Sequence, residues 1–165
     1  MIGNTLEWLT GAYRQLAEHC RTLIPGKPVA IAPYFTVRSL DESDCRHGWM
    51  RMLPRLHVDI VMLQDGIGCH RGLMAANMSP VYRAVSQACR TCGVEFWSDL
   101  EVFDSRDWRP ARIDRMRAQM KAESPYVKKI VVWEFNHDMS PRRGDRARKL
   151  YEGYRKRVCE HSPNP

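Results

Sequence analysis

The spacing of apolar residues predicts a helix at the start of the chain. Apolar side chains recur every three or four positions, at Leu6, Leu9, Tyr13, Leu16, Cys20 and Leu23. This spacing places them on one helix face, and Pro25 with Gly26 ends the helix. Capping residues, helix-starting prolines and a closing glycine predict further helices over 40–51, from Ser79 and Pro80 to Gly93, from Pro110 past Met120, and over 142–158.

Four short apolar runs lie between the predicted helices, over 28–35, 58–63, 94–103 and 129–135. Runs of this length that are apolar on both faces are typical of buried parallel strands. Four strand-then-helix units in succession predict an α/β protein whose strands are parallel and joined by right-handed crossovers. We expect a single domain over residues 1–165, with 158–165 as a C-terminal tail.

Polar residues follow each predicted strand at its C-terminal end. They are Tyr34 after the first strand, Gln64 and Asp65 after the second, Asp99 and Glu101 in the third, and Glu134 and His137 after the fourth. Ligands bind at this edge in parallel α/β folds, whether the sheet is open or closed into a barrel. The sequence therefore predicts a binding site built from these residues.

The third strand brings carboxylates into the predicted site. Its alternation puts Glu95, Trp97, Asp99 and Glu101 on one side, and an acid on a buried strand is costly unless it is paired or used. With Asp65 on the neighbouring strand, Glu101 forms the carboxylate pair of a glycoside hydrolase, with Glu101 as nucleophile or base and Asp65 as acid. The alternatives are an ion pair between Glu101 and an arginine, and a turn capped by Asp65.

The remaining candidates suit a sugar. Trp97 and Tyr34 offer stacking surfaces, Gln64 and His137 can orient hydroxyl groups, and Asp99 and Glu134 complete the predicted substrate-binding set. A metal site at Glu134, His137 and Asp138 is disfavoured because no second histidine lies close by. The single C-x-x-C at Cys89 and Cys92 lies at a helix end and has no second pair, so zinc or redox use is also disfavoured.

Composition and charge narrow the function further. No glycine-rich nucleotide loop occurs, and we expect no cofactor. The chain has a formal net charge of +7, and residues 106–157 hold sixteen Lys or Arg against seven Asp or Glu. This basic segment allows anion binding, but its aromatics do not alternate with the cations, so nucleic acid is not the expected partner. No membrane span or signal peptide is evident, and scattered thiols favour the cytoplasm.

Four motifs together carry a family resemblance: APYF at 32–35, VDIVMLQDGIG at 58–68, FWSDLEVF at 96–103 and WEFNHDMSP at 133–141. Over about 27–154 the chain resembles the bacterial DUF4434 family, glycosyl hydrolase-like proteins with a TIM-barrel fold. The resemblance implies that these are the last four strands of an eight-stranded barrel. Glu101 would then end strand seven, the nucleophile position of retaining barrel glycosidases.

The same resemblance implies that the first half of the barrel, which commonly carries the acid catalyst, has no counterpart in these residues. Four parallel strands alone leave two unpaired edges and an uncovered inner face. A missing N-terminal half, a homodimer that completes the barrel, or a rearranged compact layer would cover them. The competing functions are therefore a carbohydrate-processing enzyme and a glycan-binding or scaffold module without catalysis.

Overall fold

The computed structural model describes residues 2–33, 41–70 and 72–161. In chain order the elements are α1 (Ile2–Leu23), β1 (Ala30–Ile31), α2 (Glu42–Leu56), β2 (Ile60–Gln64), α3 (Ala75–Cys92), β3 (Glu95–Glu101), β4 (Phe103–Asp104), β5 (Arg109–Pro110), α4 (Ile113–Glu123), β6 (Lys129–Trp133), a π-helical turn (Phe135–Met139), a 3-10 turn (Pro141–Arg143) and α5 (Asp145–His161). The α/β class predicted from the sequence is confirmed.

The main sheet has the strand order β1-β2-β3-β6, and every neighbouring pair is parallel. The register aligns the strands in rows: Gln64 lies opposite Asp99, which lies opposite Val131, and Glu101 at the end of β3 lies opposite Trp133 at the end of β6. Because side chains alternate along each strand, every second row faces the same side of the sheet.

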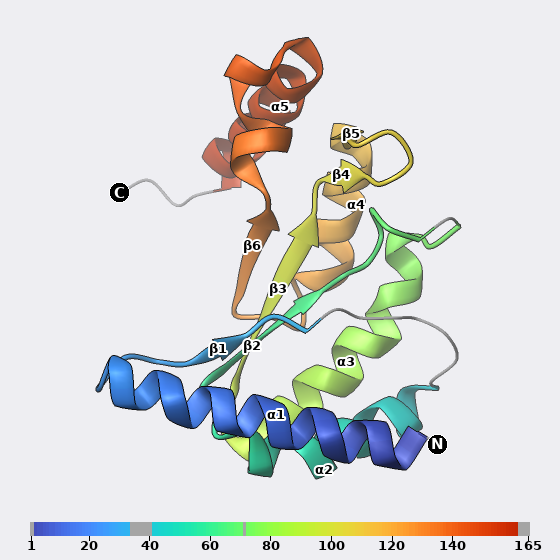
Figure 1. Cartoon of the computed structure of the whole chain (residues 1–165). Coiled ribbons are helices and arrows are strands. Elements are labelled where there is room, and N and C mark those ends of the chain that lie inside the picture. Colours follow the sequence, from blue (N-terminus) through green and yellow to red (C-terminus); the bar gives the residue numbers. More distant parts are fainter. Residues whose placement is uncertain (1, 34–40, 71, 162–165) are drawn as a thin grey trace.

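One side of the sheet packs against helices. In Figure 1, α3 and α4 lie together against the sheet, and α1 crosses its lower end beside α2. Val61, Leu63 and Phe96 from the strands join the buried side chains of α2 and α3 in one core cluster. A second cluster packs Leu100 of β3 against Met116 of α4. These contacts determine which alternate side chains of each strand face the helices.

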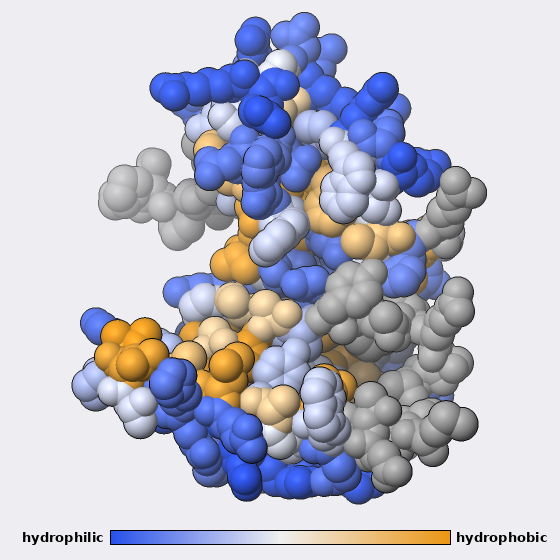
Figure 2. All heavy atoms as spheres, viewed as in Figure 1, coloured by the Kyte–Doolittle hydropathy of each residue, from blue (hydrophilic) through white to orange (hydrophobic). Residues whose placement is uncertain are grey.

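The other side of the sheet carries the alternate side chains, and no helix of the described chain packs over its centre (Figure 1). Met62, Trp97 and Val131 on this side are only partly buried, and Trp133 is exposed. Apolar residues gather between α1 and α5 in the same view, as Figure 2 shows. We call this side the open face of the sheet.

Several boundaries differ from the predictions. Helix α2 continues to Leu56, past the expected end at residue 51, and β1 spans only Ala30–Ile31 within the described residues. The helix expected to start at Ser79 and Pro80 begins at Ala75, because the Asn77 side chain accepts a hydrogen bond from the Met74 backbone N–H at 2.9 Å and caps an earlier turn. Pro80 lies inside α3, where its missing N–H removes one helical hydrogen bond.

Residues 103–110 are neither the end of a long strand nor the start of a helix. They form a short antiparallel hairpin, in which β4 pairs with β5 and Phe103 lies opposite Pro110. The Ala111 N–H also donates to the Val102 carbonyl at 2.7 Å, which closes the hairpin at its base. The helix expected at Pro110 consequently starts at Ile113.

The core cluster predicts a large effect for truncating β2. Leu63 is buried between the sheet and the helices, so Leu63→Ala should lower the free energy of unfolding by about 2–5 kcal/mol. Leu16→Ala on the exposed side of α1 is the matched control and should change it by less than about 0.5 kcal/mol. Urea unfolding of both variants measures this, and equal losses would contradict the assigned core.

Candidate active site

The C-terminal half of β3 carries two carboxyl groups on the open face. Asp99 and Glu101 alternate with Ser98 and Leu100, which face the helices. Both acids are enclosed, with exposed fractions of 6% for Asp99 and 2% for Glu101. The third strand therefore delivers two buried acids to the edge at which parallel α/β proteins bind their ligands.

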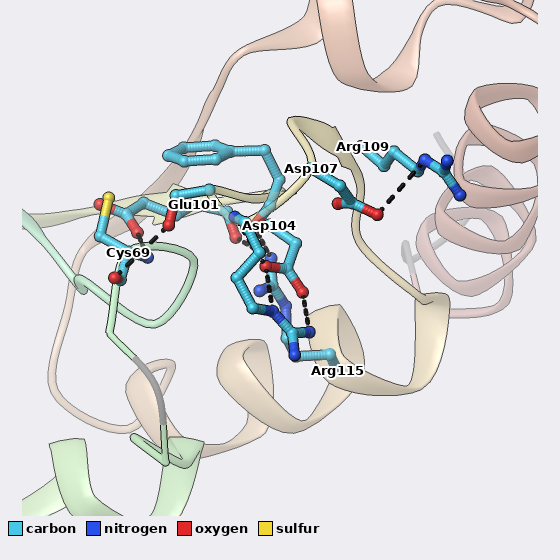
Figure 3. Close-up of polar contacts among 9 residues, drawn as sticks. Cys69, Glu101, Asp104, Asp107, Arg109 and Arg115 are labelled. Atoms are coloured by element: carbon cyan, nitrogen blue, oxygen red, sulfur yellow. Dashed lines mark hydrogen bonds and ion pairs between the residues drawn. The ribbon is translucent and has the colours of Figure 1, made fainter.

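The carboxyl group of Glu101 lies against the loop that follows β2. Its Oε2 accepts a hydrogen bond from the Cys69 N–H at 3.1 Å, and Figure 3 shows the two side chains together at the end of β3. A Cβ atom at position 68 would lie 2.9 Å from this Oε2 and 2.5 Å from the Phe103 carbonyl oxygen, so only glycine fits there. The loop backbone at Gly68 and Cys69 therefore lies in direct contact with the carboxyl group of Glu101.

Burial is the main cause of the raised pKa values of Glu101 and Asp99. Burial and, second, the charge of Asp65 together raise the pKa of Glu101 to about 7, although hydrogen bonds from Gly68 and Cys69 oppose the rise. Burial likewise raises the pKa of Asp99 to about 6, again with the help of Asp65. Groups with a pKa near neutrality can both give and take a proton, which general acid–base catalysis requires.

Asp65 lies deeper than the sequence suggested. It is fully buried, and its Oδ1 accepts hydrogen bonds from the N–H groups of Ile67 at 3.1 Å and Glu101 at 3.3 Å. Its Oδ2 accepts one from the Gln119 amide of α4. Asp65 is therefore enclosed between the sheet and α4, where it holds the backbone at the end of β3 instead of lining a cleft.

Arg115 of α4 also holds the end of β3. Its Nη2 donates to the carbonyl oxygens of Glu101 at 2.9 Å and Phe103 at 2.5 Å, and Figure 3 shows it beneath the strand end, beside Asp104. Among the residues that the structure describes, no cation forms an ion pair with the Glu101 carboxylate. The arginine fixes the backbone and leaves the acid unneutralised.

The predicted binding residues fall into separate places. Gln64 lies in the same row as Asp99, with its Nε2 3.5 Å from the Ala32 carbonyl. Trp97 lies lower on the open face, where its indole N–H donates to Glu95 at 3.0 Å and the Lys129 ammonium lies 4.5 Å from its ring centroid. Trp97 is four residues, about 13 Å, from Glu101 along the strand.

Glu134 and His137 form an ion pair with each other in the π-helical turn after β6. Neither hydrogen-bonds to Asp99 or Glu101 within the described part of the chain. Tyr34, the remaining predicted stacking residue, lies outside the described residues. The structure thus groups Gln64, Asp99 and Glu101 and places Trp97 lower on the strand, while Glu134 follows Trp133, the residue opposite Glu101.

Trp133 is an aromatic residue of the fourth predicted strand that was not included in the predicted substrate-binding set. It ends β6 directly opposite Glu101, and 51% of its surface is exposed. An exposed indole beside buried carboxyl groups and an amide is the mixture that binds sugar rings. Alternation along β6 indicates that Lys129, Val131 and Trp133 share one face of the strand. That Trp133 lies opposite Glu101 follows only from the register between β3 and β6, which the sequence does not give.

A cavity of about 690 Å³ lies beside the site, between the loop after β2, the β4–β5 hairpin and α4. Its arginines are already engaged: Arg106 binds Asp104, and Arg115 binds two carbonyl groups. Neither Asp99 nor Glu101 lines it. Its lining includes Cys69, His70 and Asp104, so the cavity adjoins the two acids of β3 without containing them.

Metal and thiol chemistry have little support in the described residues. No group of three His, Cys, Asp or Glu side chains is arranged there to hold a metal ion. In the C-x-x-C pair, burial raises the pKa of Cys89 to about 12, which opposes formation of the thiolate. None of the described helices is long and apolar enough to span a bilayer.

The family relationship follows from comparison with known proteins. Residues 3–145 match the model of DUF4434, a domain of unknown function. The chain belongs to the DUF4434 family. This confirms the resemblance carried by the four motifs, and none of the curated proteins compared with the chain matches it.

Two solved structures share the fold of this DUF4434 chain. One is described as a "putative alpha-L-fucosidase" from Bacteroides thetaiotaomicron, with 21% identity and a TM-score of 0.75 over 89% of this chain and 50% of that one. The other is a family 18 chitinase from Crocus vernus, with 13% identity and a TM-score of 0.55 over 90% and 54%. The chain therefore has a glycoside-hydrolase-like fold and spans about half the length of these neighbours.

The raised pKa of Glu101 predicts a pH dependence of stability. The folded chain holds this proton more tightly than the unfolded chain, so the stabilisation is complete below pH 4.5 and is lost as the pH rises to about 7. Relative to wild type, Glu101→Gln should therefore gain stability between these values and stay level above them. Urea unfolding across this pH range measures the difference.

Glu95→Gln, on the same face of β3, is the control, and its effect on stability should change with pH in the opposite direction. The Lys128 ammonium and the Trp97 indole lower the pKa of Glu95 below 4.5. The stability that Glu95 contributes is therefore present above pH 4.5 and is lost as the pH falls through its folded value. Parallel curves for the two variants would contradict the assigned environments.

Proposed function

We propose that this chain is the catalytic half of a glycoside hydrolase barrel, with Glu101 as its reactive carboxyl group. The observation that carries the proposal is the row at the end of β3 and β6, where a buried acid of raised pKa lies opposite the exposed ring of Trp133. The glycosidase-like fold of the neighbours supports it as an analogy of architecture.

In this proposal each group has one role. Glu101 acts as nucleophile or base at the sugar carbon, Trp133 stacks on the apolar face of the ring, and Gln64 orients a hydroxyl group. Asp99, one row below, offers a second carboxyl group to the hydroxyl groups of the sugar. Asp65 positions the backbone of Glu101 and does not touch the substrate, since its side chain lies on the helix side of the sheet against Gln119 of α4.

The acid that protonates the leaving oxygen must come from elsewhere. Glycosidases place their two carboxyl groups on opposite sides of the scissile bond, about 5 Å apart for retention and about 6.5–9.5 Å for inversion. Asp99 and Glu101 project from one strand in one direction, so they approach a sugar from the same side. We infer that the acid lies on a second half-barrel facing the open face.

The two edges of the sheet fit such a partner. Within the described chain, β1 and β6 each pair on one side only, and parallel edges of this kind join in a closed barrel. A second copy is a poor occupant, because it would bring another Glu95, Asp99 and Glu101 into the same enclosed interior. The occupant we propose is a half-barrel of different sequence, equivalent to the first four units of the family barrel.

Binding without hydrolysis is the second candidate function. The described half-barrel retains an exposed indole and hydrogen-bonding groups at its rim but holds no carboxyl group facing Glu101 across a cleft. A module of this kind would bind a glycan and leave it intact. Turnover therefore separates the two functions, whereas binding does not.

Substitution of Glu101 tests the enzymatic proposal. Hydrolysis of a panel of nitrophenyl glycosides by the chain together with its second half should fall at least about 100-fold in Glu101→Gln. Glu95→Gln, at the other end of the same strand face, should retain the wild-type rate. Unchanged hydrolysis in Glu101→Gln would remove this residue from the mechanism, and saturable glycan binding without turnover in wild type would favour the binding module.

Light scattering tests the proposed partner. Alone, the chain should have the mass of one 19.2 kDa protomer, and it should form a one-to-one complex with the N-terminal half of a DUF4434 barrel. Val131→Lys on the open face should abolish that complex, because it buries a charge in the interface. Arg117→Glu on exposed α4 surface is the control. A stable dimer of identical chains would contradict the proposal.

A further inference from the structure

Behind the end of β3, two carboxyl groups share one enclosed site. Asp65 and Glu123, the last residue of α4, are both fully buried and lie within hydrogen-bonding contact of each other. Among the described residues no cation pairs with either one. The nearest guanidinium, that of Arg115, donates to two backbone carbonyl groups. Two ionised carboxylates cannot share such a site cheaply, so one of them holds a proton.

The hydrogen-bond donors differ between the two groups. Asp65 accepts from three: the N–H groups of Ile67 and Glu101, and the amide of Gln119. Glu123 has fewer donors: the Ser98 hydroxyl donates to its Oε2, the Tyr82 hydroxyl also contributes, and no donor reaches its buried Oε1 in the described chain. Donors stabilise a carboxylate, so this arrangement favours ionised Asp65 and a proton on Glu123.

We propose that Glu123 is a neutral carboxylic acid at neutral pH, whose Oε1 carries the proton and donates it to the carboxylate of Asp65. Asp65 then remains charged, holds the N–H of Glu101, and places a negative charge behind the open-face carboxyl groups. Glu123 is a positioning residue in this scheme, since it acts through Asp65 and touches no substrate. The inference concerns the site of the proposed function but does not require hydrolysis.

The surroundings support this assignment. Burial raises the pKa of both groups, but the charge of Asp65 adds to the rise at Glu123, whereas hydrogen bonds from Gln119 and from two backbone N–H groups oppose the rise at Asp65. The polar groups around the pair are Tyr82 of α3, which bonds Ser98; Ser98 of β3; and Gln119 and Arg115 of α4. The side chains of Asp99 and Glu101 project from the other face of β3.

A consequence reaches the proposed active site. The charge of Asp65 is the second cause, after burial, of the raised pKa values of Asp99 and Glu101. If Glu123 can no longer donate, Asp65 takes up a proton itself, and the pKa of Glu101 should fall toward its ordinary value. Glu123→Leu should have this effect, whereas Glu123→Gln should not, because its amide can still donate to Asp65 and accept from Ser98.

Infrared spectroscopy at pH 8 tests the proton directly, because this pH lies above the pKa of Asp99 and Glu101, so a carboxyl proton that persists there belongs to the buried pair. Wild type should show a protonated carboxyl band that Glu123→Gln loses. In Asp65→Asn the proton on Glu123 should be released at a lower pH than in wild type, because the charge of Asp65 is gone. A band that survives in Glu123→Gln at pH 8, or a band in Asp65→Asn that titrates as in wild type, would overturn the proposal. If one variant does not fold, the other decides.

Carboxyl NMR titration of Glu101 supplies the second readout. The expected result is a wild-type pKa in Glu123→Gln and a lowered pKa in Glu123→Leu. A merely structural role for Glu123 would leave the pKa of Glu101 unchanged in every folded variant, and that outcome would overturn the positioning role. Neither measurement uses a substrate, so the absence of hydrolysis would count against the proposed function alone.

Discussion

The pairing of β3 with β2 on one side and β6 on the other is the constraint on which the site depends. Parallel register puts Glu101 opposite Trp133 and Asp99 opposite both Gln64 and Val131. The same register sends Ser98 and Leu100 into the helix layer. A slip of one residue would exchange the two faces and put the carboxyl groups of β3 against the core.

Helix α4 connects the core to the site. Met116 on this helix packs under β3, while Gln119, Arg115 and Glu123 on neighbouring turns reach the polar end of the strands. These side chains satisfy the backbone and Asp65, and no cation of the described residues forms an ion pair with Asp99 or Glu101. No ion pair therefore stabilises the ionised form of Asp99 or Glu101, so the pKa values of both groups stay high.

The sequence predicted the class, the order of the strands and the open-face side chains of β3, because these follow from hydrophobic period and chain order. It did not predict the depth of Asp65. An Asp before Gly66 indicates a turn whichever way its side chain points, and the direction is set by Gln119 and Ile67, which no local pattern links to it. The β4–β5 hairpin also depends on pairing, so Pro110 resembled a helix start.

The protonation of the carboxyl groups at the end of β3 depends on how far the open face is covered. A half-barrel exposes Trp133 to solvent, yet Asp99 and Glu101 are already buried, and the loop after β2 contacts the carboxyl group of Glu101. Closing a second half over them would remove more water and strengthen every electrostatic interaction in the site. A proton held on Glu123 and a charge held on Asp65 give the enclosed site a fixed electrostatic state before any partner or sugar arrives, which is the preorganisation that catalysis by charge stabilisation needs.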